Sequence, residues 1–354
     1  MKAFIYSKLE KKAQLLEISK PIIEEKDETF FYPLYVAICG SDLHMFLGSD
    51  AYNWVKENLV LGHEIVGFID NEHDLYVVNP YIPCGKCELC QIGATNYCTG
   101  PKEKLAKTQP PYSLQYGFRK NGGLAEIMVV KKENLIKVPY GLNAELCAFS
   151  EALAVGYRAV MQSFDLLNRA PSTALVIGPG PIGMGISFVL KGKGINVCLL
   201  GLEKDFERLE IAKKMGIYCA TSDVKKIKEY LKQFGNGEAD LVFEASGSKK
   251  AYEIVLSLVK RRGVIMSVGI GDDLCTLSMR QLVRGGVIIS GSYGVLQEDI
   301  IRVLDLLNNN KKEATMFIDK IFQFSEVNNA FEYALKAKAK VLIHIGGNKN
   351  ERNY

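Results

Sequence analysis

A glycine-rich turn that directly follows a short apolar run is the feature that most restricts how this chain can fold. Residues 174–177 are all apolar, and the chain continues into a helix-like stretch as Gly178-Pro-Gly180-Pro181-Ile182-Gly183. In this setting Gly178 permits a tight turn, and Gly180 lets the backbone approach a pyrophosphate. Gly183 allows the helix to pack closely, and the phosphates would lie at the amino end of that helix. The pattern predicts a strand, turn and helix that bind a dinucleotide.

Further apolar runs follow this turn at intervals that leave room for a crossover helix between them. They lie within residues 197–200, 240–244, 264–268 and 287–290. Strands that alternate with helices predict a parallel, doubly wound sheet in an α/β fold. The first third of the chain instead has short β-type runs separated by turn residues, which indicates a loop-rich, barrel-like β domain.

The chain has 354 residues, a length that suits two domains. After about residue 320 the pattern of strand, helix and strand is interpreted as the chain rejoining its first domain. We therefore expect a catalytic domain at residues 1–155 that is rejoined by residues 296–354. The dinucleotide-binding domain is expected between them, at residues 156–295.

Composition restricts the partners and the compartment. The net charge is only +4, and the Lys and Arg pairs are scattered rather than gathered in a stripe with aromatic residues, so nucleic acid is not expected as a partner. No apolar run approaches the roughly eighteen residues of a membrane span, and the first residues lack a signal-peptide core. We expect a cytoplasmic protein with no membrane partner.

Four of the nine cysteines are closely spaced, which indicates a metal site rather than disulfides. They follow the pattern C-x2-C-x2-C-x7-C at Cys84, Cys87, Cys90 and Cys98. Four thiolates repel one another unless a thiophilic cation lies between them, and a closed tetrahedral set is typical of structural zinc. An iron–sulfur cluster is the competing interpretation, but the fourth cysteine lacks the C-x3-C-P setting of ferredoxins.

A second group of metal-binding side chains lies near the start of the chain. The sequence Cys39-Gly-Ser41-Asp42-Leu-His44 is followed by Gly62-His63-Glu64. Cys39 supplies a thiolate and His63 an imidazole, while Glu64 could either bind the metal or lie beside its ligands. A catalytic zinc keeps one position open for substrate, and alcohol oxidation needs such a Lewis acid.

In this order the two cysteine-containing motifs and the glycine turn resemble the zinc-dependent medium-chain alcohol/polyol dehydrogenase family, over essentially the whole chain. The resemblance implies a GroES-like β catalytic domain, a Rossmann cofactor domain, one catalytic and one structural zinc, and NAD or NADP. It makes Cys39 and His63 zinc ligands. It also implies that Ser41 bonds the substrate hydroxyl and that His44 ends a proton relay through the cofactor ribose to solvent. Asp42 would orient His63.

The third protein ligand differs between branches of that family, being a cysteine in one and a glutamate in the polyol branch. The polyol pattern E-x-L-[SA]-V-G is matched by the segment that begins at Glu151. Zn²⁺, one thiolate, one carboxylate and a neutral histidine sum to zero charge. If Glu64 and Glu151 both bound, the site would be more anionic, and exchange between them is conceivable. Cys147 is the alternative ligand.

The preference between NAD and NADP stays open. The acid that usually holds the adenosine ribose should end the run 197–200, but that position is Gly201. Its absence removes repulsion against a 2′-phosphate, with which Arg208 could pair, whereas Glu203 could reach the ribose hydroxyls. We lean toward NADP tolerance. Ser246 and Val268, which follow later strands, are further expected cofactor contacts.

We expect an oxidoreductase that transfers a hydride between a polyol, sugar or secondary alcohol and NAD(P). A threonine-dehydrogenase-like or glucose-type aldose enzyme is the alternative, and a non-catalytic nucleotide-binding scaffold is a hypothesis from another class. Tyr52, Asn53 and Trp54 could line the substrate site, although packing is the simpler role. A homo-oligomer, dimer or tetramer, is expected through the edge of the cofactor sheet around residues 274–290.

Overall fold

The glycine turn lies between a buried parallel strand and a helix, as predicted. The strand is β11 (Thr173–Ile177), all five residues of which are buried, and helix α5 (Pro181–Gly192) begins within the turn. Gly178 has a φ of +102°, which favours glycine. A Cβ atom on Gly183 would lie 1.9 Å from the carbonyl oxygen of Gly178, so only glycine fits where the helix starts.

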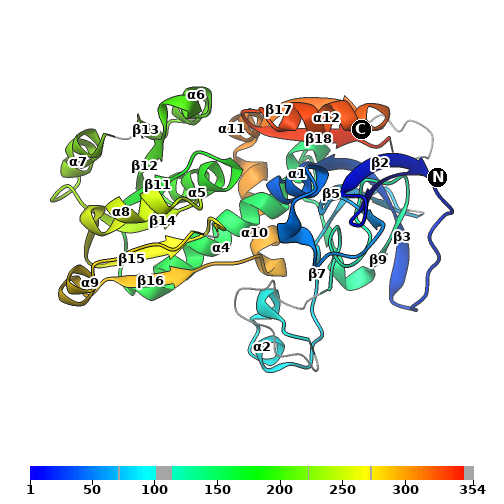
Figure 1. Cartoon of the computed structure of the whole chain (residues 1–354), viewed down its shortest axis with the longest axis horizontal. Coiled ribbons are helices and arrows are strands. Elements are labelled where there is room, and N and C mark those ends of the chain that lie inside the picture. Colours follow the sequence, from blue (N-terminus) through cyan, green and yellow to red (C-terminus); the bar gives the residue numbers. More distant parts are fainter. Residues whose placement is uncertain (71, 101–113, 222, 272, 347–354) are drawn as a thin grey trace. The chain divides into compact units, whose positions relative to one another are not determined.

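Strand β11 belongs to a six-stranded sheet in which every pair is parallel, in the order β13-β12-β11-β14-β15-β16 (Figure 1). This is the doubly wound α/β architecture that the alternating pattern predicted. The other strands are β12 (Asn196–Gly201), β13 (Tyr218–Thr221), β14 (Ala239–Glu244), β15 (Val259–Ser267) and β16 (Ile288–Gly291). The helices between them are α6 (Phe206–Lys214), α7 (Val224–Lys232), α8 (Lys249–Leu258) and α9 (Met279–Gly285).

The computed structural model describes residues 1–70, 72–100, 114–221, 223–271 and 273–346. The chain divides into two units, one formed by Met1–Glu151 with Val295–Tyr354 and the other by Ala152–Gly294. Helix α4 (Ser150–Leu167) begins at the boundary in sequence between them. Within the described ranges, no helix has both the length and the apolar character that a membrane span requires.

The first unit is built on a seven-stranded sheet, ordered β10-β6-β5-β3-β18-β17 with β9 also paired to β3. Its strands are β3 (Glu28–Ala37), β5 (Glu64–Ile69), β6 (Tyr76–Val78), β9 (Met128–Lys131), β10 (Leu135–Lys137), β17 (Ile318–Gln323) and β18 (Lys340–His344). Smaller sheets are formed by β1 (Lys2–Ser7), β2 (Lys12–Glu17) and β4 (Leu59–Val60), and by β7 (Tyr81–Ile82) and β8 (Leu114–Gln115). The helices of this unit are α1 (Gly40–Phe46), α2 (Glu88–Gln91), α3 (Ala144–Cys147), α10 (Gln297–Asn309), α11 (Lys311–Ala314) and α12 (Val327–Ala334).

The register of this sheet gathers three distant parts of the chain at one end. Ala37, the last residue of β3, pairs with Glu64 of β5 on one side and with Leu342 of β18 on the other. The chain leaves β3 through Cys39 into α1, and β18 starts at Lys340. The strand pairing therefore brings Cys39, Glu64 and Lys340 to the same edge.

Candidate functional site

One buried carboxylate organises the segment that contains Cys39. Asp42, in the first turn of α1, accepts a hydrogen bond from the backbone N–H of Cys39 through Oδ2 (3.0 Å) and one from Gly62 through Oδ1 (3.3 Å). Its Oδ2 also lies 3.7 Å from Nδ1 of His63. Asp42 thus joins the Cys39 turn to the segment that carries His63, the geometry expected of a residue that orients an imidazole.

Cys39, His63 and Glu64 come together in the structure. One ligand atom from each lies within 4.8 Å of the others, and His63 and Glu64 are buried. His63 Nδ1, Glu64 Oε2 and Ser41 Oγ are buried atoms without a hydrogen-bond partner. Leaving a buried polar atom unpaired costs roughly 1–3 kcal/mol, so three in one place need an explanation. A zinc ion with an open position for a hydroxyl fits this donor set.

A buried lysine that the sequence reasoning missed completes the cluster. Lys340 is 4% exposed, and its Nζ donates to Oε1 of Glu64 and to the carbonyl of Ile38 (3.3 Å). Burial acts to lower the pKa of Lys340, but the Glu64 and Cys39 charges outweigh it and the pKa is raised. The sequence offered a signal, because Lys340 directly precedes the apolar residues 341–343, which belong to the last strand expected after about residue 320.

Glu151 faces the same charges from the start of α4. It is 7% exposed, and burial, with a further contribution from the Glu64 carboxylate, raises its pKa to about 7, although His63 acts in the opposite direction. Its oxygens are not among the ligand atoms that approach one another within 4.8 Å. Cys147, the alternative ligand, is buried and donates its thiol to the carbonyl of Asn143 (3.2 Å).

Burial also acts to lower the pKa of His63, but Asp42 and Cys39 more than compensate. The pKa of the imidazole is raised well above its ordinary value by these two negative groups. A buried imidazole between a carboxylate and a thiolate lies in a negative potential that attracts a cation. The charges of the site and its unpaired buried atoms therefore both favour a bound metal ion.

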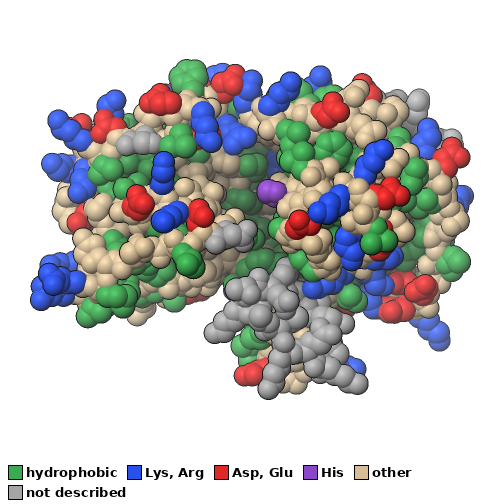
Figure 2. All heavy atoms as spheres, in the orientation of Figure 1, with side chains coloured by type: hydrophobic (Ala, Val, Ile, Leu, Met, Phe, Trp, Pro, Cys, Tyr) green, Lys and Arg blue, Asp and Glu red, His purple; other side chains and the backbone are tan. Residues whose placement is uncertain are grey.

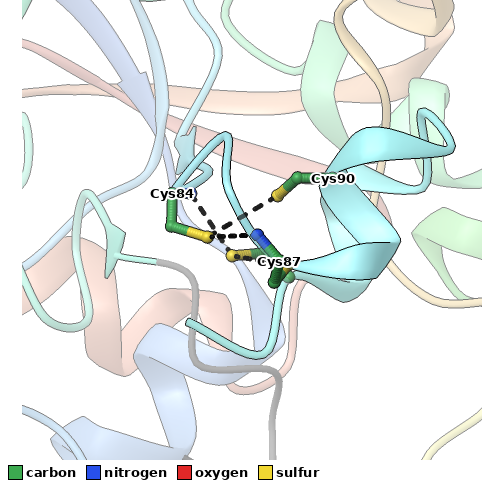
Figure 3. A group of neighbouring side chains, drawn as sticks. Cys84, Cys87 and Cys90 are labelled. Atoms are coloured by element: carbon green, nitrogen blue, oxygen red, sulfur yellow. Dashed lines mark hydrogen bonds between the residues drawn. The ribbon is translucent and has the colours of Figure 1, made fainter. Parts of the chain in front are cut away.

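The sulfurs of the four clustered cysteines lie within 4.8 Å of one another. Figure 3 shows three of these side chains, Cys84, Cys87 and Cys90, beside α2. The sulfurs of Cys84 and Cys90 are 3.9 Å apart, as are those of Cys87 and Cys98. Zinc–sulfur bonds of about 2.3 Å in a tetrahedron place sulfurs about 3.8 Å apart. An iron–sulfur cluster would hold its cysteines further apart, on separate irons. The backbone N–H groups of Cys84, Cys87 and Gly100 donate to these sulfurs, which favours thiolates.

An arc of aromatic rings connects the two histidines of the first unit's site. His44 stacks on Tyr52 with centroids 5.9 Å apart, Tyr52 contacts Trp54 at 6.1 Å, and Trp54 stacks on Phe118 at 5.6 Å. Phe118 in turn lies 4.8 Å from the ring of His63. Phe118 was not singled out from the sequence, because its link to His63 depends on the fold.

In the second unit the expected cofactor residues gather at the carboxyl ends of the strands. Gly178 follows β11, and a Cβ there would lie 2.9 Å from the Cβ of Ser246, which follows β14. Val268 follows β15 and donates its N–H to the carbonyl of Glu244 (2.8 Å). The Glu244 carboxylate accepts from the backbone N–H groups of Ser246 (2.7 Å) and Gly247 (3.2 Å), which orders that turn. This is the edge where such folds bind nucleotides.

Gly201 ends β12, and there is little room for a side chain at this position. A Cβ atom on it would lie 2.9 Å from Cγ of Pro179. Glu203 begins a short 3₁₀ turn, Glu203–Asp205, and Arg208 lies in the first turns of α6. The close contact with Pro179 of the glycine turn thus explains why residue 201 is a glycine rather than an acid.

Comparison with known proteins matches both halves of the chain to described families. Residues 29–140 match the alcohol dehydrogenase GroES-like domain, and residues 181–309 match the zinc-binding dehydrogenase family. A sorbitol dehydrogenase of Halalkalibacterium halodurans is 27% identical over 87% of this chain and 89% of its own length. A D-arabitol-phosphate dehydrogenase of Enterococcus avium is 26% identical over 90% of each chain. The crystal structure of an L-idonate 5-dehydrogenase from Escherichia coli shares the fold, with a TM-score of 0.83, 23% identity, and coverage of 97% and 98%.

Proposed function

Since the chain belongs to the zinc-dependent medium-chain alcohol/polyol dehydrogenase family, we propose that this NAD(P)-dependent oxidoreductase acts on a polyol or sugar alcohol. The observation that carries the proposal is the meeting of Cys39, His63 and Glu64 within 4.8 Å, with buried unpaired atoms on His63, Glu64 and the neighbouring Ser41. A non-catalytic nucleotide-binding scaffold would have no use for these groups in one place.

In this proposal Cys39 and His63 hold the catalytic zinc, and Glu64 and Glu151 share the third position. Lys340 changes the charge balance of that arrangement. Zn²⁺, one thiolate, two carboxylates and the buried ammonium group sum to zero, so both glutamates can stay near the ion without making the site anionic. Bound there, zinc supplies a Lewis acid that lowers the pKa of the substrate hydroxyl. Cys84, Cys87, Cys90 and Cys98 hold the structural zinc.

Two side chains of α1 handle the hydroxyl proton. Ser41 Oγ is buried without a partner, and it accepts a hydrogen bond from the substrate hydroxyl in this proposal. His44 is exposed and stacks on Tyr52, so it can pass to solvent the proton that the substrate hydroxyl gives up. NAD(P) would supply the acceptor for the carbon-bound hydrogen as a hydride, and Asp42 keeps His63 in place.

The second unit holds the cofactor through its strand ends. Gly178, Gly180 and Gly183 bind the pyrophosphate, while Pro181 and Ile182 form the start of the helix beneath it. Ser246 and Val268 contact the nicotinamide half. We assign Arg208 to a 2′-phosphate and Glu203 to the ribose hydroxyls of NAD, with Gly201 excluding neither cofactor.

A substrate panel with metal analysis tests this function. Short alcohols, polyols, aldoses and threonine are each offered with NAD and with NADP, and reduced cofactor is followed by its absorbance. The expected result is chelator-sensitive turnover of a polyol and two zinc ions per chain. Turnover of threonine alone would support the alternative substrate class. No turnover together with one zinc per chain would contradict the enzyme and favour a scaffold.

We also propose that the protein is a cytoplasmic homo-oligomer, dimer or tetramer. All nine cysteines are free, which suits a reducing compartment. Strand β16 is an edge of the cofactor sheet, and a free edge is a template for a second copy. Large apolar side chains nearby are exposed, among them Leu274 (89%) and Val283 (72%). Figure 2 shows hydrophobic side chains beside Lys and Arg at the lower left, over α9.

Light scattering after gel filtration is expected to give the mass of a dimer or tetramer. Ile288→Lys places a charge on the exposed edge strand β16 and should shift the mass toward the monomer, because a charged side chain on an edge strand disfavours pairing with a second copy. Ile321→Lys is the matched control, since Ile321 is similarly exposed on β17, an edge strand of the other unit's sheet. A monomeric wild type, or an Ile288→Lys variant that stays fully assembled, would contradict this interface.

A further inference from the structure

A cavity outside the proposed catalytic and cofactor sites lies at the far end of the cofactor sheet. Its volume is about 740 Å³, and all of its lining residues belong to one unit of the structure. They lie at the end of α8, along α9 and at the amino ends of β14, β15 and β16. Strand β14 rises about 3.3 Å per residue from Ala239 to Glu244, so roughly 17 Å of strand separate this cavity from the edge expected to bind the cofactor.

Three exposed arginines line the cavity and have donors to spare. Arg261 donates one N–H to the carbonyl of Arg284 (3.4 Å), which leaves the other donors of its guanidinium unused. In the part of the chain that the structure describes, the side chains of Arg280 and Arg284 make no hydrogen bond or ion pair. A guanidinium fork matches a phosphate in two parallel hydrogen bonds.

The other charged residues of the cavity do not neutralise these arginines. Glu238 is the only carboxylate among the described lining residues, and its Oε2 accepts from the side-chain amide of Asn236 (2.9 Å). Lys260 also lines the cavity, but its Nζ already pairs with Asp240 (3.0 Å). With that lysine set aside, three guanidinium groups and one carboxylate leave a net charge of +2.

Helix α9 does not compensate for the charge either. Arg280 and Arg284 are four residues apart on one face of the helix, and like charges in that relation destabilise it. The helix has no acidic residue, and Arg280 lies in its first turn, where the helix dipole disfavours a cation. A bound anion would offset both effects.

The cavity also has an apolar part, which restricts the ligand further. Leu256, Val259 and Val287 contribute to its lining. A volume of about 740 Å³ is typical of small-molecule sites and is far larger than a single phosphate ion requires. The combination suits a small organic molecule that carries two phosphate groups on a partly apolar body.

The cavity uses a different face of α9 from the apolar face proposed to contact a second copy. Met279 and Val283 are exposed, and neither lines the cavity. Each directly precedes one of the two arginines, a step of about 100° around the helix. The apolar pair can therefore contact another copy while Arg280 and Arg284 hold an anion.

We propose that this cavity is a second ligand site, in which Arg261, Arg280 and Arg284 bind a small organic molecule with two phosphate groups. A sugar bisphosphate and a nucleoside diphosphate share this chemistry. The site takes no part in hydride transfer, and the inference does not rest on the proposed substrate.

Calorimetric titration tests the site on the zinc-loaded protein. The protein is first saturated with NADH or NADPH, whichever binds more tightly, so that the glycine turn is occupied. It is then titrated with inorganic phosphate, fructose 1,6-bisphosphate or ADP at physiological ionic strength, where the screening length is about 8 Å. Fructose 1,6-bisphosphate or ADP is expected to bind at least about 10-fold more tightly than inorganic phosphate, because a second phosphate adds charge-assisted hydrogen bonds. Tighter binding of one of the two identifies the sugar or the nucleotide as the source.

Arg280→Met combined with Arg284→Met removes two charges at exposed positions and should weaken this binding by about 10- to 100-fold. Cofactor affinity and turnover should stay at the wild-type level, and replacing both arginines with lysine should restore part of the binding. Lys213→Met combined with Lys214→Met is the matched control, because it removes two exposed charges at the end of α6, outside the cavity. Light scattering of each variant distinguishes loss of the site from loss of assembly.

The outcomes separate this inference from the proposed function. Affinities for fructose 1,6-bisphosphate and ADP no greater than for inorganic phosphate, or equal losses in the arginine and lysine variants, would overturn the site while polyol oxidation stands. Binding that occurs only as the fluorescent reduced cofactor is displaced would place the ligand at the glycine turn and also overturn it. Arginine-dependent binding in a protein that oxidises no alcohol would support the site and contradict the enzyme function.

Discussion

Replacing Cys39 with serine is expected to lower turnover by at least about 10³-fold and to reduce the zinc content from two ions per chain to one. A serine hydroxyl is not deprotonated at neutral pH, so it cannot supply the charge of the thiolate. Loss of the Lewis acid removes several kcal/mol of stabilisation from the developing alkoxide. Turnover is followed by reduced cofactor absorbance, and zinc by elemental analysis.

The fold should survive this change, because the backbone N–H of Cys39, rather than its sulfur, anchors Asp42. Cys275→Ser is the control for loss of a thiol, since Cys275 is exposed and lies in the other unit. Cys147→Ser addresses the alternative ligand and should keep both zinc ions. If Cys39→Ser kept two zinc ions and wild-type turnover, the catalytic site would have to lie elsewhere.

The parts of the structure that depend on local sequence could be predicted from it. The position of the glycine turn between a strand and a helix could be predicted because both glycines meet local steric requirements. Gly178 has a positive φ, and Gly183 lies at the start of the helix, where there is no room for a Cβ atom. The four cysteines likewise lie in one short segment of the chain. Closely spaced thiolates repel one another unless they bind a thiophilic cation, so their convergence could be predicted from the sequence alone.

The parts of the structure that depend on pairing between distant strands could not be predicted from the sequence. Lys340 is 276 residues from Glu64, and the two meet only because β18 pairs with β3 and β3 pairs with β5. The charge argument from the sequence treated two glutamates as an excess of negative charge, because it did not include this lysine. The link from Trp54 through Phe118 to His63 was missed for the same reason, since the residues come from three separate loops.

A second buried charge network lies at the opposite end of the cofactor sheet, away from the glycine turn. Asp240 is the second residue of β14 and is fully buried. Its Oδ1 accepts from Arg169 (2.6 Å) and its Oδ2 from Lys260 (3.0 Å). The backbone N–H and hydroxyl groups of Ser172 and Thr173 also donate to Oδ2, at 3.0–3.1 Å. Every partner is a donor, so only an ionised carboxylate satisfies them all.

Asp240→Asn is therefore expected to lower the free energy of unfolding by about 3–5 kcal/mol, the cost of breaking a buried charge pair from one side. The amide would also turn an NH₂ group toward a neighbouring donor. Urea unfolding at pH 7 measures the loss, and the zinc content should stay at two ions per chain. Glu298→Gln is the control, because it breaks an exposed pair with Arg302 and should cost less than about 1 kcal/mol.

The pH dependence distinguishes this charge effect from a packing defect. Burial alone would raise the pKa of Asp240, but its donors and the Arg169 and Lys260 charges hold it well below the usual range. A carboxyl with a lowered folded-state pKa contributes stability above its unfolded pKa of about 3.9, and this is lost as the pH falls toward the folded pKa. The difference between wild type and Asp240→Asn should therefore narrow below about pH 4. A difference that stays constant between pH 7 and pH 3 would mean that shape rather than charge makes Asp240 stabilising.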